Sequence, residues 1–230
     1  MEFTYRYLLY SLLFLAPFSS AQGNSGVAFT DRYYDCCKPS CGWADKGKFI
    51  NPVTSCDKDD NPLPGNGYQA GSGCQDGGTA YACTNQSPWA VNDTFSYGFA
   101  GAYIKDHLDD TWCCACYELT FTSGPVAGKK MLIQASNSAF DIITTNRFAL
   151  AVSLRRAMEQ NIKIADRLQI PGGNTSATNT CAAEYAVANS TFGVDGQGVG
   201  SRSDCDALPS KLKASCQWRF DWFMNADRPS

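Results

Sequence analysis

The chain has 230 residues, of which 44% are hydrophobic and 13% aromatic, and its formal net charge is −3. This composition is typical of a globular protein, excludes a disordered one, and lacks the basic excess expected of a nucleic-acid-binding protein. The length suffices for one substantial core and would also allow two small domains. Because the sequence shows no internal repeat and no Ser/Thr/Pro-rich linker, we expect a single folded unit.

Residues 1–21 are predicted to be a signal peptide. Arg6 precedes the apolar run 8–18, and Ser19-Ser20-Ala21 offers a cleavage site of small residues. The apolar run is too short to span a bilayer comfortably. We therefore expect a secreted, extracellular protein that does not bind membranes, with a mature chain that begins near Gln22.

Residues 33–43 form the most informative stretch of the chain, with the sequence YYDCCKPSCGW. Asp35 lies between aromatic residues and three cysteines, Cys36, Cys37 and Cys41. If these cysteines are oxidised, the backbone around Asp35 is fixed on both sides, which suits acid–base work on a sugar. The alternative is that Asp35 only caps a turn in a disulfide-rich loop, and spacing alone does not decide between the two.

The middle of the chain indicates short strands and long loops. Residues 44–95 are rich in Gly, Asn, Asp and Pro. Alternating residues predict a strand at 117–122, and a second strand is predicted at 130–135 after the turn around Gly124-Pro125. The two strands are expected to pair as a hairpin.

Two later segments have different periodicities. Apolar residues at helical spacing predict a helix over 148–165, interpreted as a surface helix on its own core and not as a membrane-surface helix. Alternating aromatic and charged residues at 218–223 predict a strand, or simply core packing by Trp and Phe with Arg219 and Asp221 paired nearby. The predicted fold class is therefore mainly β with at least one helix.

Twelve cysteines in an exported chain imply a disulfide framework. The dense group at 113–116 raises zinc as an alternative, but zinc sites repeat paired cysteines or add histidines, and this chain has only His107. We expect disulfides and no metal. Sequons at Asn92, Asn174 and Asn189 predict glycosylation, in keeping with secretion.

The inventory of reactive groups points to carboxylate chemistry. A single histidine argues against a Ser-His-Asp triad, and the sequence contains no zinc helix, phosphate loop or dinucleotide fingerprint, so no cofactor is expected. The remaining candidates are carboxylates, including Asp35, Asp141 and Asp166. Together with secretion and aromatic residues, they favour carbohydrate hydrolysis, in which two carboxyl groups flank the scissile bond.

Several motifs, in the same order along the chain, resemble glycoside hydrolase family 45, the secreted endoglucanases of the cellulase K type. They comprise 33–43, 112–122 (WCCACYELTFT), 128–131, 170–173 (IPGG), 216–223 (CQWRFDWF) and 225–227. The resemblance implies a six-stranded double-psi β-barrel with long disulfide-bonded loops and an open cleft, formed by a catalytic domain over 22–230. It also implies inverting hydrolysis of internal bonds in a β-1,4-glucan by a monomer.

Carried over position by position, the resemblance assigns roles to five residues. Asp35 would be the general base that activates water, and Asp141 an auxiliary carboxylate on a mobile loop. The loop carboxylate could help to keep the catalytic acid protonated, because like charges raise a neighbour's pKa. Tyr33, Trp43 and Lys38 would bind the sugar chain.

The chain departs from the family pattern where the general acid belongs. The run Asn-His-Phe-Asp-Leu reads Asn146-Arg147-Phe148-Ala149-Leu150, and an extra segment follows before Ile170. Either Asp166 supplies the proton from a re-routed loop, or the copy is inactive, or the insert over 149–167 is retained intron sequence. Asp31 stands where the family has threonine, and Gly101 is a smaller departure.

The resemblance also implies the disulfide pairing. The pairs would be Cys36–Cys181, Cys37–Cys74, Cys41–Cys113, Cys56–Cys83 and Cys205–Cys216. Cys114 and Cys116 would then lack partners within this chain, because the family pairs them with cysteines beyond its last residue. The catalytic domain would thus be truncated at its C-terminal end and carry no cellulose-binding module.

Two rival functions follow from the alanine at the acid position and from the fold. Expansin-like proteins share the double-psi barrel, so the chain could bind and loosen cell walls without hydrolysis. A small secreted recognition protein, such as an inhibitor, is the third interpretation and requires a protein partner in place of a glucan.

Overall fold

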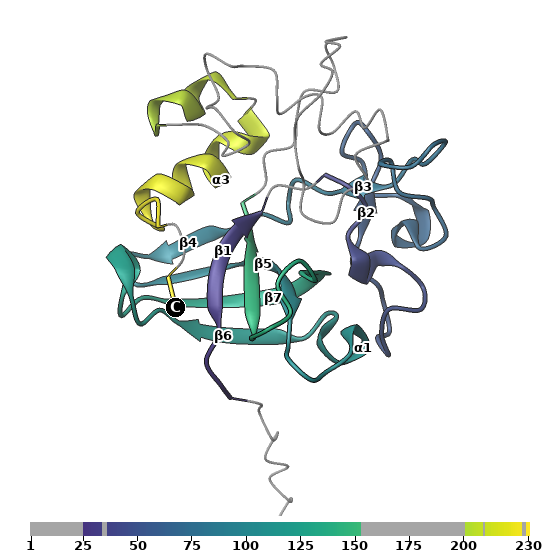
Figure 1. Ribbon diagram of the computed structural model, residues 1–230. Coiled ribbons are helices and arrows are strands. Elements are labelled where there is room, and N and C mark those ends of the chain that lie inside the picture. Colours follow the sequence, from purple (N-terminus) through teal and green to yellow (C-terminus); the bar gives the residue numbers. More distant parts are fainter. Residues whose placement is uncertain (1–24, 34–35, 153–200, 209, 227–228) are drawn as a thin grey trace, which may run out of the picture.

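A computed structural model of the chain describes residues 25–33, 36–152, 201–208, 210–226 and 229–230. The fold is mainly β: six strands share one sheet, a second sheet has two strands, and one longer helix lies near the C-terminal end (Figure 1). The loops between residues 36 and 83 form the second region, drawn in blue in Figure 1.

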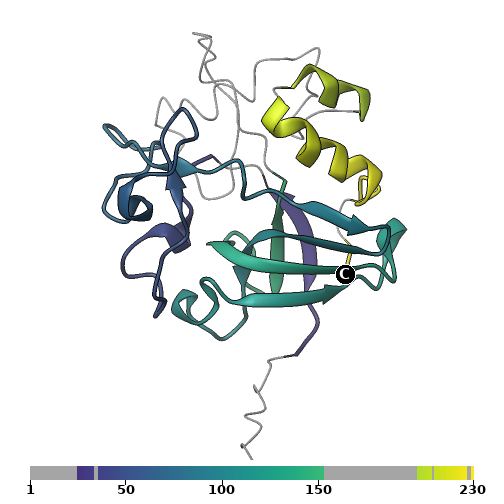
Figure 2. The same cartoon turned by 180° about the vertical axis from the view of Figure 1, so that it is seen from behind.

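The large sheet mixes parallel and antiparallel pairs. Its strands are β1 (Phe29–Tyr33), β4 (Trp89–Asn92), β5 (Phe95–Tyr103), β6 (Cys116–Thr120), β7 (Lys130–Ser138) and β8 (Arg147–Ala151). The order is β1-β8-β5-β7-β6, with β4 pairing β5. The pairs β1–β8 and β5–β7 are parallel, and the others are antiparallel. Seen from behind, β4, β5, β7 and β6 lie side by side (Figure 2).

The smaller elements surround this sheet. β2 (Ser55–Cys56) pairs with β3 (Tyr81–Ala82), and the helices are α1 (Asp109–Trp112) and α3 (Ser210–Asp221). Short 3₁₀ turns are η1 (Ser40–Gly42), η2 (Pro64–Gly67), η3 (Gly124–Val126) and η4 (Ser203–Ala207). None of the helices in the described ranges has the length and apolar character needed to cross a membrane.

The predicted hairpin is confirmed. β6 and β7 pair antiparallel, with Tyr117 opposite Ile133 and Leu119 opposite Met131. Along β7 the side chains of Met131, Ile133 and Ala135 are buried, while the residues between them are more exposed. This alternation follows from the period of two in a strand, and it directs the apolar face into the core.

The two edge strands of the sheet path are connected by the last two residues. Pro229 O accepts hydrogen bonds from Thr30 N at 3.0 Å and Thr30 Oγ1 at 2.6 Å. Ser230 O accepts from Thr122 N, directly after β6, at 2.5 Å. Because Thr30 belongs to β1, this short segment bridges the β1 and β6 sides of the sheet, between which no strand pairing is present in the described ranges.

The strand predicted at 218–223 is wrong, because residues 218–221 are the end of α3 and residues 222 and 223 follow it as a turn and a bend. The buried residues of α3 are Leu212, Ser215, Cys216, Trp218 and Arg219, a spacing that places them on one helical face. The alternative, core packing, is confirmed for the aromatic residues: Trp218 stacks on Trp222 with ring centroids 5.4 Å apart. Asp221 pairs with Arg202 at 2.7 Å, and not with Arg219 as expected.

The helix predicted over 148–165 is wrong at its start. Residues 147–151 form β8, which is completely buried between β1 and β5. Pairing on both edges satisfies the backbone of these residues, and the burial of Phe148 and Leu150 in the core outweighs local helical periodicity. Residues 153–165 lie outside the described part of the chain.

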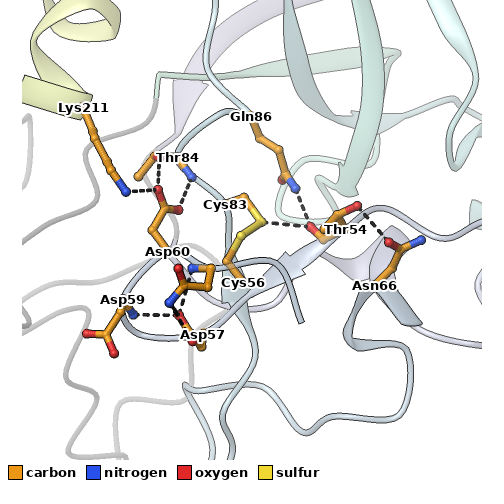
Figure 3. Close-up of a disulfide and its surroundings, with 11 residues drawn as sticks. Thr54, Cys56, Asp57, Asp59, Asp60, Asn66, Cys83, Thr84, Gln86 and Lys211 are labelled. Carbon is orange, nitrogen blue, oxygen red and sulfur yellow. Dashed lines mark hydrogen bonds and ion pairs between the residues drawn. A yellow bond between two sulfur atoms is a disulfide. The ribbon is translucent and has the colours of Figure 1, made fainter. Parts of the chain in front are cut away.

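The loop region is connected by disulfides and side-chain hydrogen bonds. Figure 3 shows the Cys56–Cys83 disulfide, which joins β2 to the end of β3, with Asp60 beside it. The Asp60 carboxylate accepts hydrogen bonds from Thr84 N and Thr84 Oγ1. It also forms an ion pair with Lys211 of α3, with Nζ and Oδ2 3.1 Å apart. The long loops predicted for this region are therefore fixed to the helix as well as to each other.

Candidate functional site

The segment that contains Asp35 is described on both sides, while Asp35 itself lies outside the described residues. Before it, Tyr33 ends β1 opposite Ala151 of β8. After it, the carbonyl of the buried Cys36 accepts a hydrogen bond from Ala82 N at 3.0 Å, and Cys37 forms a bridge with Tyr81. Backbone pairing therefore fixes the chain on either side of positions 34–35.

Disulfides fix the rest of this motif. Cys37 is bonded to Cys74 and Cys41 to Cys113, while Cys56–Cys83 and Cys205–Cys216 are the other described bonds. These are four of the pairings that the resemblance implies, and the fifth, Cys36–Cys181, involves a residue outside the described part. Every described cysteine of the motif is thus held to a distant part of the chain.

A second contact ties the motif to β7. Ser40 N donates to Asn137 Oδ1 at 2.9 Å, and Ser40 Oγ lies 3.1 Å from Ser138 Oγ. Sequence reasoning did not find Asn137 and Ser138, because a hydrogen bond between residues 97 positions apart leaves no local signal. The turn η1 therefore rests directly on the end of a central strand.

Trp43 follows η1 and is partly exposed, as a sugar-stacking residue must be. The ammonium of Lys38 lies 3.9 Å from the centroid of the Trp43 ring, a cation–π contact that holds the indole in place. Tyr33 is likewise partly exposed. These two aromatic residues thus lie on opposite sides of position 35 in the sequence, and both reach the surface.

The charged end of Lys38, for which the sequence predicted substrate binding, lies inside the protein. The residue is 4% exposed, and its Nζ donates to the carbonyls of Gly67 at 2.8 Å, Tyr68 at 3.0 Å and Ala70 at 2.9 Å. An ammonium has three donors, so none remains for a sugar hydroxyl. Burial also lowers the pKa of Lys38 from its ordinary value. Lys38 therefore supports Trp43 and the loop 67–70 from inside.

A cavity of about 530 Å³ lies beside this cluster. It is lined by Ala44, 49–52 and 63–70, which include the loop whose carbonyls Lys38 binds. Tyr68 OH donates to Ala44 O at 3.2 Å across it. The lining thus includes Ala44, the residue after Trp43 in the sequence.

Asp141 lies in the connection between β7 and β8, and its carboxylate is engaged by Arg147. The Arg147 Nη1 donates to Asp141 Oδ1, while Nη2 and Nε bind the carboxylate of Asp31 on β1 at 2.5 to 3.2 Å. Burial opposes the charge on Arg147, but the two carboxylates outweigh it and raise the pKa of its guanidinium. Sequence reasoning named Arg147 only as a departure from the family pattern and not as a partner of Asp141.

Ala149, at the position where the resemblance implies a general acid, lies on β8 and is 3% exposed. Its neighbours on the adjacent strands are Asp31 of β1 and Gly101 of β5. A methyl group cannot donate a proton, so this position supplies no acid. Asp166, the other candidate, lies outside the described residues.

The comparisons decide the family. The family model described as glycosyl hydrolase family 45 matches residues 25–154 and 159–230, which include every residue that the structure describes. The chain belongs to glycosyl hydrolase family 45. Only residues 155–158 interrupt the match, within the segment predicted as an insert.

Relatives that match most of this chain are named as endoglucanases. A Fusarium oxysporum protein named as a type K endoglucanase is 44% identical over 222 residues, covering 96% of this chain and 52% of that protein. An endoglucanase of Cryptopygus antarcticus is 38% identical over 206 residues, covering 90% and 81%. The chain therefore spans about half the length of the first relative.

A solved structure of a cellulase has a similar fold. The crystal structure of the cellulase from the Antarctic springtail Cryptopygus antarcticus matches with a TM-score of 0.67 and 36% identity. The match covers 88% of this chain and 86% of that one. The arrangement of strands and loops described above is thus similar to that of this cellulase.

The family 45 chain contains two free thiols in its described part, Cys114 and Cys116. Cys116 is exposed, whereas burial raises the pKa of the half-buried Cys114. No group of three His, Cys, Asp or Glu side chains in the described ranges is arranged to hold a metal ion. Asn92, at the exposed end of β4, is accessible for glycosylation, while Asn174 and Asn189 lie outside these ranges.

Proposed function

We propose that this chain is a secreted endo-β-1,4-glucanase that hydrolyses internal bonds of cellulose or a related β-glucan with inversion. The observation that supports this most is the family 45 match combined with the pairing of β1 on one side of positions 34–35 and of Cys36 and Cys37 on the other. A fixed carboxylate between partly exposed aromatic residues can be held against one face of a sugar ring. The β-glucan chain is the expected partner.

In this mechanism Asp35 is the general base that removes a proton from the attacking water. Inverting enzymes separate their two carboxyl groups by about 6.5–9.5 Å, which leaves room for that water. Tyr33 and Trp43 bind the sugars on either side. We assign the acid role to Asp166, because Ala149 cannot serve and Asp166 adjoins the Leu168–Pro171 motif in the sequence.

We further propose that the sheet closes into a double-psi barrel. Pro229 and Ser230 support this, because they bridge the two edge strands β1 and β6. The proposed domain covers 22–230, follows a signal peptide at 1–21, and acts as a monomer. N-terminal sequencing of the secreted protein should begin near Gln22, and light scattering should give the mass of one chain.

Release of reducing ends from carboxymethyl cellulose and from a mixed-linkage β-glucan tests the hydrolase. Asp35→Ala should lower the rate by about 10²–10⁴-fold, the usual contribution of a positioned acid or base. Asp45→Ala, an exposed aspartate in the same loop, serves as the matched control and should retain the parental rate. Equal rates for Asp35→Ala and the parent would remove Asp35 from the mechanism. Proton NMR of early products should show the α-anomer first.

A pair of substitutions separates the possible sources of the acid. If Asp166 donates the proton, Asp166→Ala should reduce hydrolysis by about 10²–10⁴-fold. If the acid is absent, Asp166→Ala changes nothing, and Ala149→Asp should raise the rate. An unchanged rate in both variants would exclude both positions as acid sites.

The second candidate is a non-hydrolytic, expansin-like wall-binding protein. It is favoured by one observation, the buried alanine at the acid position of β8. This candidate predicts sedimentation with cellulose and no new reducing ends, with or without Asp166. Inhibition of a partner protein without glucan binding would instead favour the recognition protein.

A further inference from the structure

Arg147 is a buried cation between two carboxylates. Its side chain is 5% exposed, against 12% for Asp31 and 25% for Asp141. Nε donates to both oxygens of Asp31 at 3.0 and 3.2 Å, Nη2 donates to Asp31 Oδ2 at 2.5 Å, and Nη1 donates to Asp141. The planar guanidinium thus holds Asp31 in a fork, with Asp141 on its remaining edge. This cluster is the Asp31–Arg147–Asp141 triad.

Two members of the triad depart together from the family pattern. Asp31 and Arg147 stand where the motifs of the resemblance have threonine and histidine, and the two side chains bind each other across neighbouring strands β1 and β8. A buried Arg or Asp without its partner would leave an uncompensated charge, which is strongly destabilising. The presence of Asp31 on β1 therefore explains how Arg147 can be buried on β8, and Arg147 explains Asp31 in the same way.

The triad connects the two segments that carry proposed site carboxylates. Asp31 lies two residues before Tyr33 in the strand that leads to Asp35, and Asp141 lies in the 139–146 loop between β7 and β8. The ends of this loop are fixed separately. Phe140 packs on Tyr103 and Trp112, and Asn146 Nδ2 donates to Val27 O at 2.9 Å. Arg147 supplies the contact that fixes the carboxylate itself.

Arg147 cannot itself bind substrate. Its donors on Nε and on both terminal nitrogens face protein carboxylates, and the side chain is almost completely covered, with Phe29 5.8 Å from the guanidinium carbon. Any effect on hydrolysis must therefore pass through Asp141 or through β1. Because Asp141 is the most exposed member, it is the one that can reach solvent and a glucan bound there.

We propose that Arg147, held by Asp31, is a positioning residue that orients the loop carboxylate of Asp141 toward the substrate. The proposal rests on the proposed hydrolase function. In this arrangement the loop carboxylate is fixed before substrate arrives, through a cation that the family pattern lacks. A displacement of about 1 Å in such a group can cost about 100-fold in rate.

A double-mutant cycle tests the proposal. Arg147→Lys keeps the charge but loses the fork, and Asp141→Asn removes the charge it positions. On soluble mixed-linkage β-glucan each single variant should lower kcat by about 10- to 100-fold with KM changed less. The double variant should be no worse than Asp141→Asn alone, because Arg147 acts through that residue. Additive losses would overturn the proposal.

A second pair keeps the test valid if single variants fold poorly. Asp31→Thr alone should lower kcat, while Asp31→Thr combined with Arg147→His restores the residue types of the family pattern and should recover folding. The kcat of the double variant should exceed that of Asp31→Thr. A double variant no more active than Asp31→Thr would contradict the idea that Asp31 and Arg147 compensate for each other. Arg202→Lys, which perturbs the exposed Arg202–Asp221 pair, is the matched control and should behave as the parent.

Hydrogen exchange provides a readout that does not depend on hydrolysis. Amides of residues 139–146 should exchange faster in Arg147→Lys than in the parent, while those of β5 stay unchanged. If the parent hydrolyses no glucan, the proposed function fails, but faster exchange in this loop still supports positioning by Arg147. Unchanged exchange in Arg147→Lys would overturn it.

Discussion

The ammonium group of Lys38 donates hydrogen bonds to three backbone carbonyls and lies over the ring of Trp43. A lysine in the middle of a catalytic motif was predicted to contact substrate, and its charge alone favours that interpretation. The direction of a lysine side chain is set by what surrounds it after folding, which the sequence does not reveal. Here the long stem carries the charge inward to the loop 67–70.

Lys38→Met should therefore destabilise the fold and the Trp43 surface together. It removes hydrogen bonds from a charged donor and leaves three acceptors without that donor, so the free energy of unfolding should fall by about 1.5–3 kcal/mol. Chemical denaturation measures this change. Lys58→Met, at a lysine exposed on the same loop region and paired with Asp59, should cause no measurable change. Equal stability of both variants would contradict the structural role of Lys38.

The two free thiols should react at different rates. Burial raises the pKa of Cys114, so at a given pH a smaller fraction of this thiol is the reactive thiolate, and access is also restricted. Labelling with iodoacetamide should modify the exposed Cys116 first, and the share of Cys114 should increase as the pH is raised. Mass spectrometry of Cys114→Ser and Cys116→Ser variants measures each site. Faster labelling of Cys114 at neutral pH would contradict the prediction.

The helix α3 is attached to the sheet by one buried polar contact among its aromatic ones. Trp218 Nε1 donates to Ser96 Oγ at 2.9 Å, and Trp218 stacks on Trp222 and Phe223. Ser96 is completely buried on β5. The contact therefore determines how α3 sits on the sheet.

Ser96→Ala should lower the free energy of unfolding by about 1–3 kcal/mol, because it leaves the buried indole N–H without its acceptor. Trp218→Phe removes the donor and keeps an aromatic ring, so combining it with Ser96→Ala should cost less than the sum of the two. Urea denaturation measures all three variants. Ser203→Ala, at an exposed serine, should match the parent, and strictly additive costs in the double variant would refute the coupling.

The elements that the sequence predicted correctly are those whose periodicity and tertiary setting agree. β6 and β7 alternate because one face of each meets the core. At 218–223 the alternation also fits a helix, because Trp218 and Trp222 are four residues apart. At 148–151 the apolar spacing fits a helix, but strands on both sides impose β8. Both errors arise where short apolar patterns fit either period.

Only those residues of the candidate site that belong to a recognisable sequence motif could be predicted. The aromatic and cysteine positions of 33–43 follow from the resemblance, and four of the implied cysteine pairs are bonded in the structure. The contacts of Asp31 and Ser40 were not predictable. Asp31 meets Arg147 through a parallel strand pair 116 residues apart, and Ser40 meets Asn137 across a similar distance. Such contacts depend on strand register and sheet order, which single-sequence patterns do not specify.

The loops of 36–83 and the sheet are two regions that share the proposed cleft. The Cys41–Cys113 bond, the Ser40–Asn137 hydrogen bond and the Lys46–Asp109 pair at 2.7 Å connect them on one side. On the other side Lys211 of α3 reaches Asp60. The exposed ion pairs contribute little to stability. The disulfide is therefore the principal link that keeps Trp43 in place relative to β1.

Removing the Cys41–Cys113 bond should cost more than removing Cys205–Cys216. The bonds span 72 and 11 residues, for which the chain-entropy relation gives about 4.4 and about 2.8 kcal/mol at 25 °C. Double Cys→Ser variants of each pair, compared by chemical denaturation, measure the difference. Well below the unfolding transition, glucan hydrolysis should fall only in the Cys41→Ser/Cys113→Ser variant, because that bond alone of the two holds the loop of Trp43 to the residues ahead of β6. A larger stability loss or a larger activity loss in the Cys205→Ser/Cys216→Ser variant would show that the C-terminal helix, and not this long crosslink, keeps the two regions together.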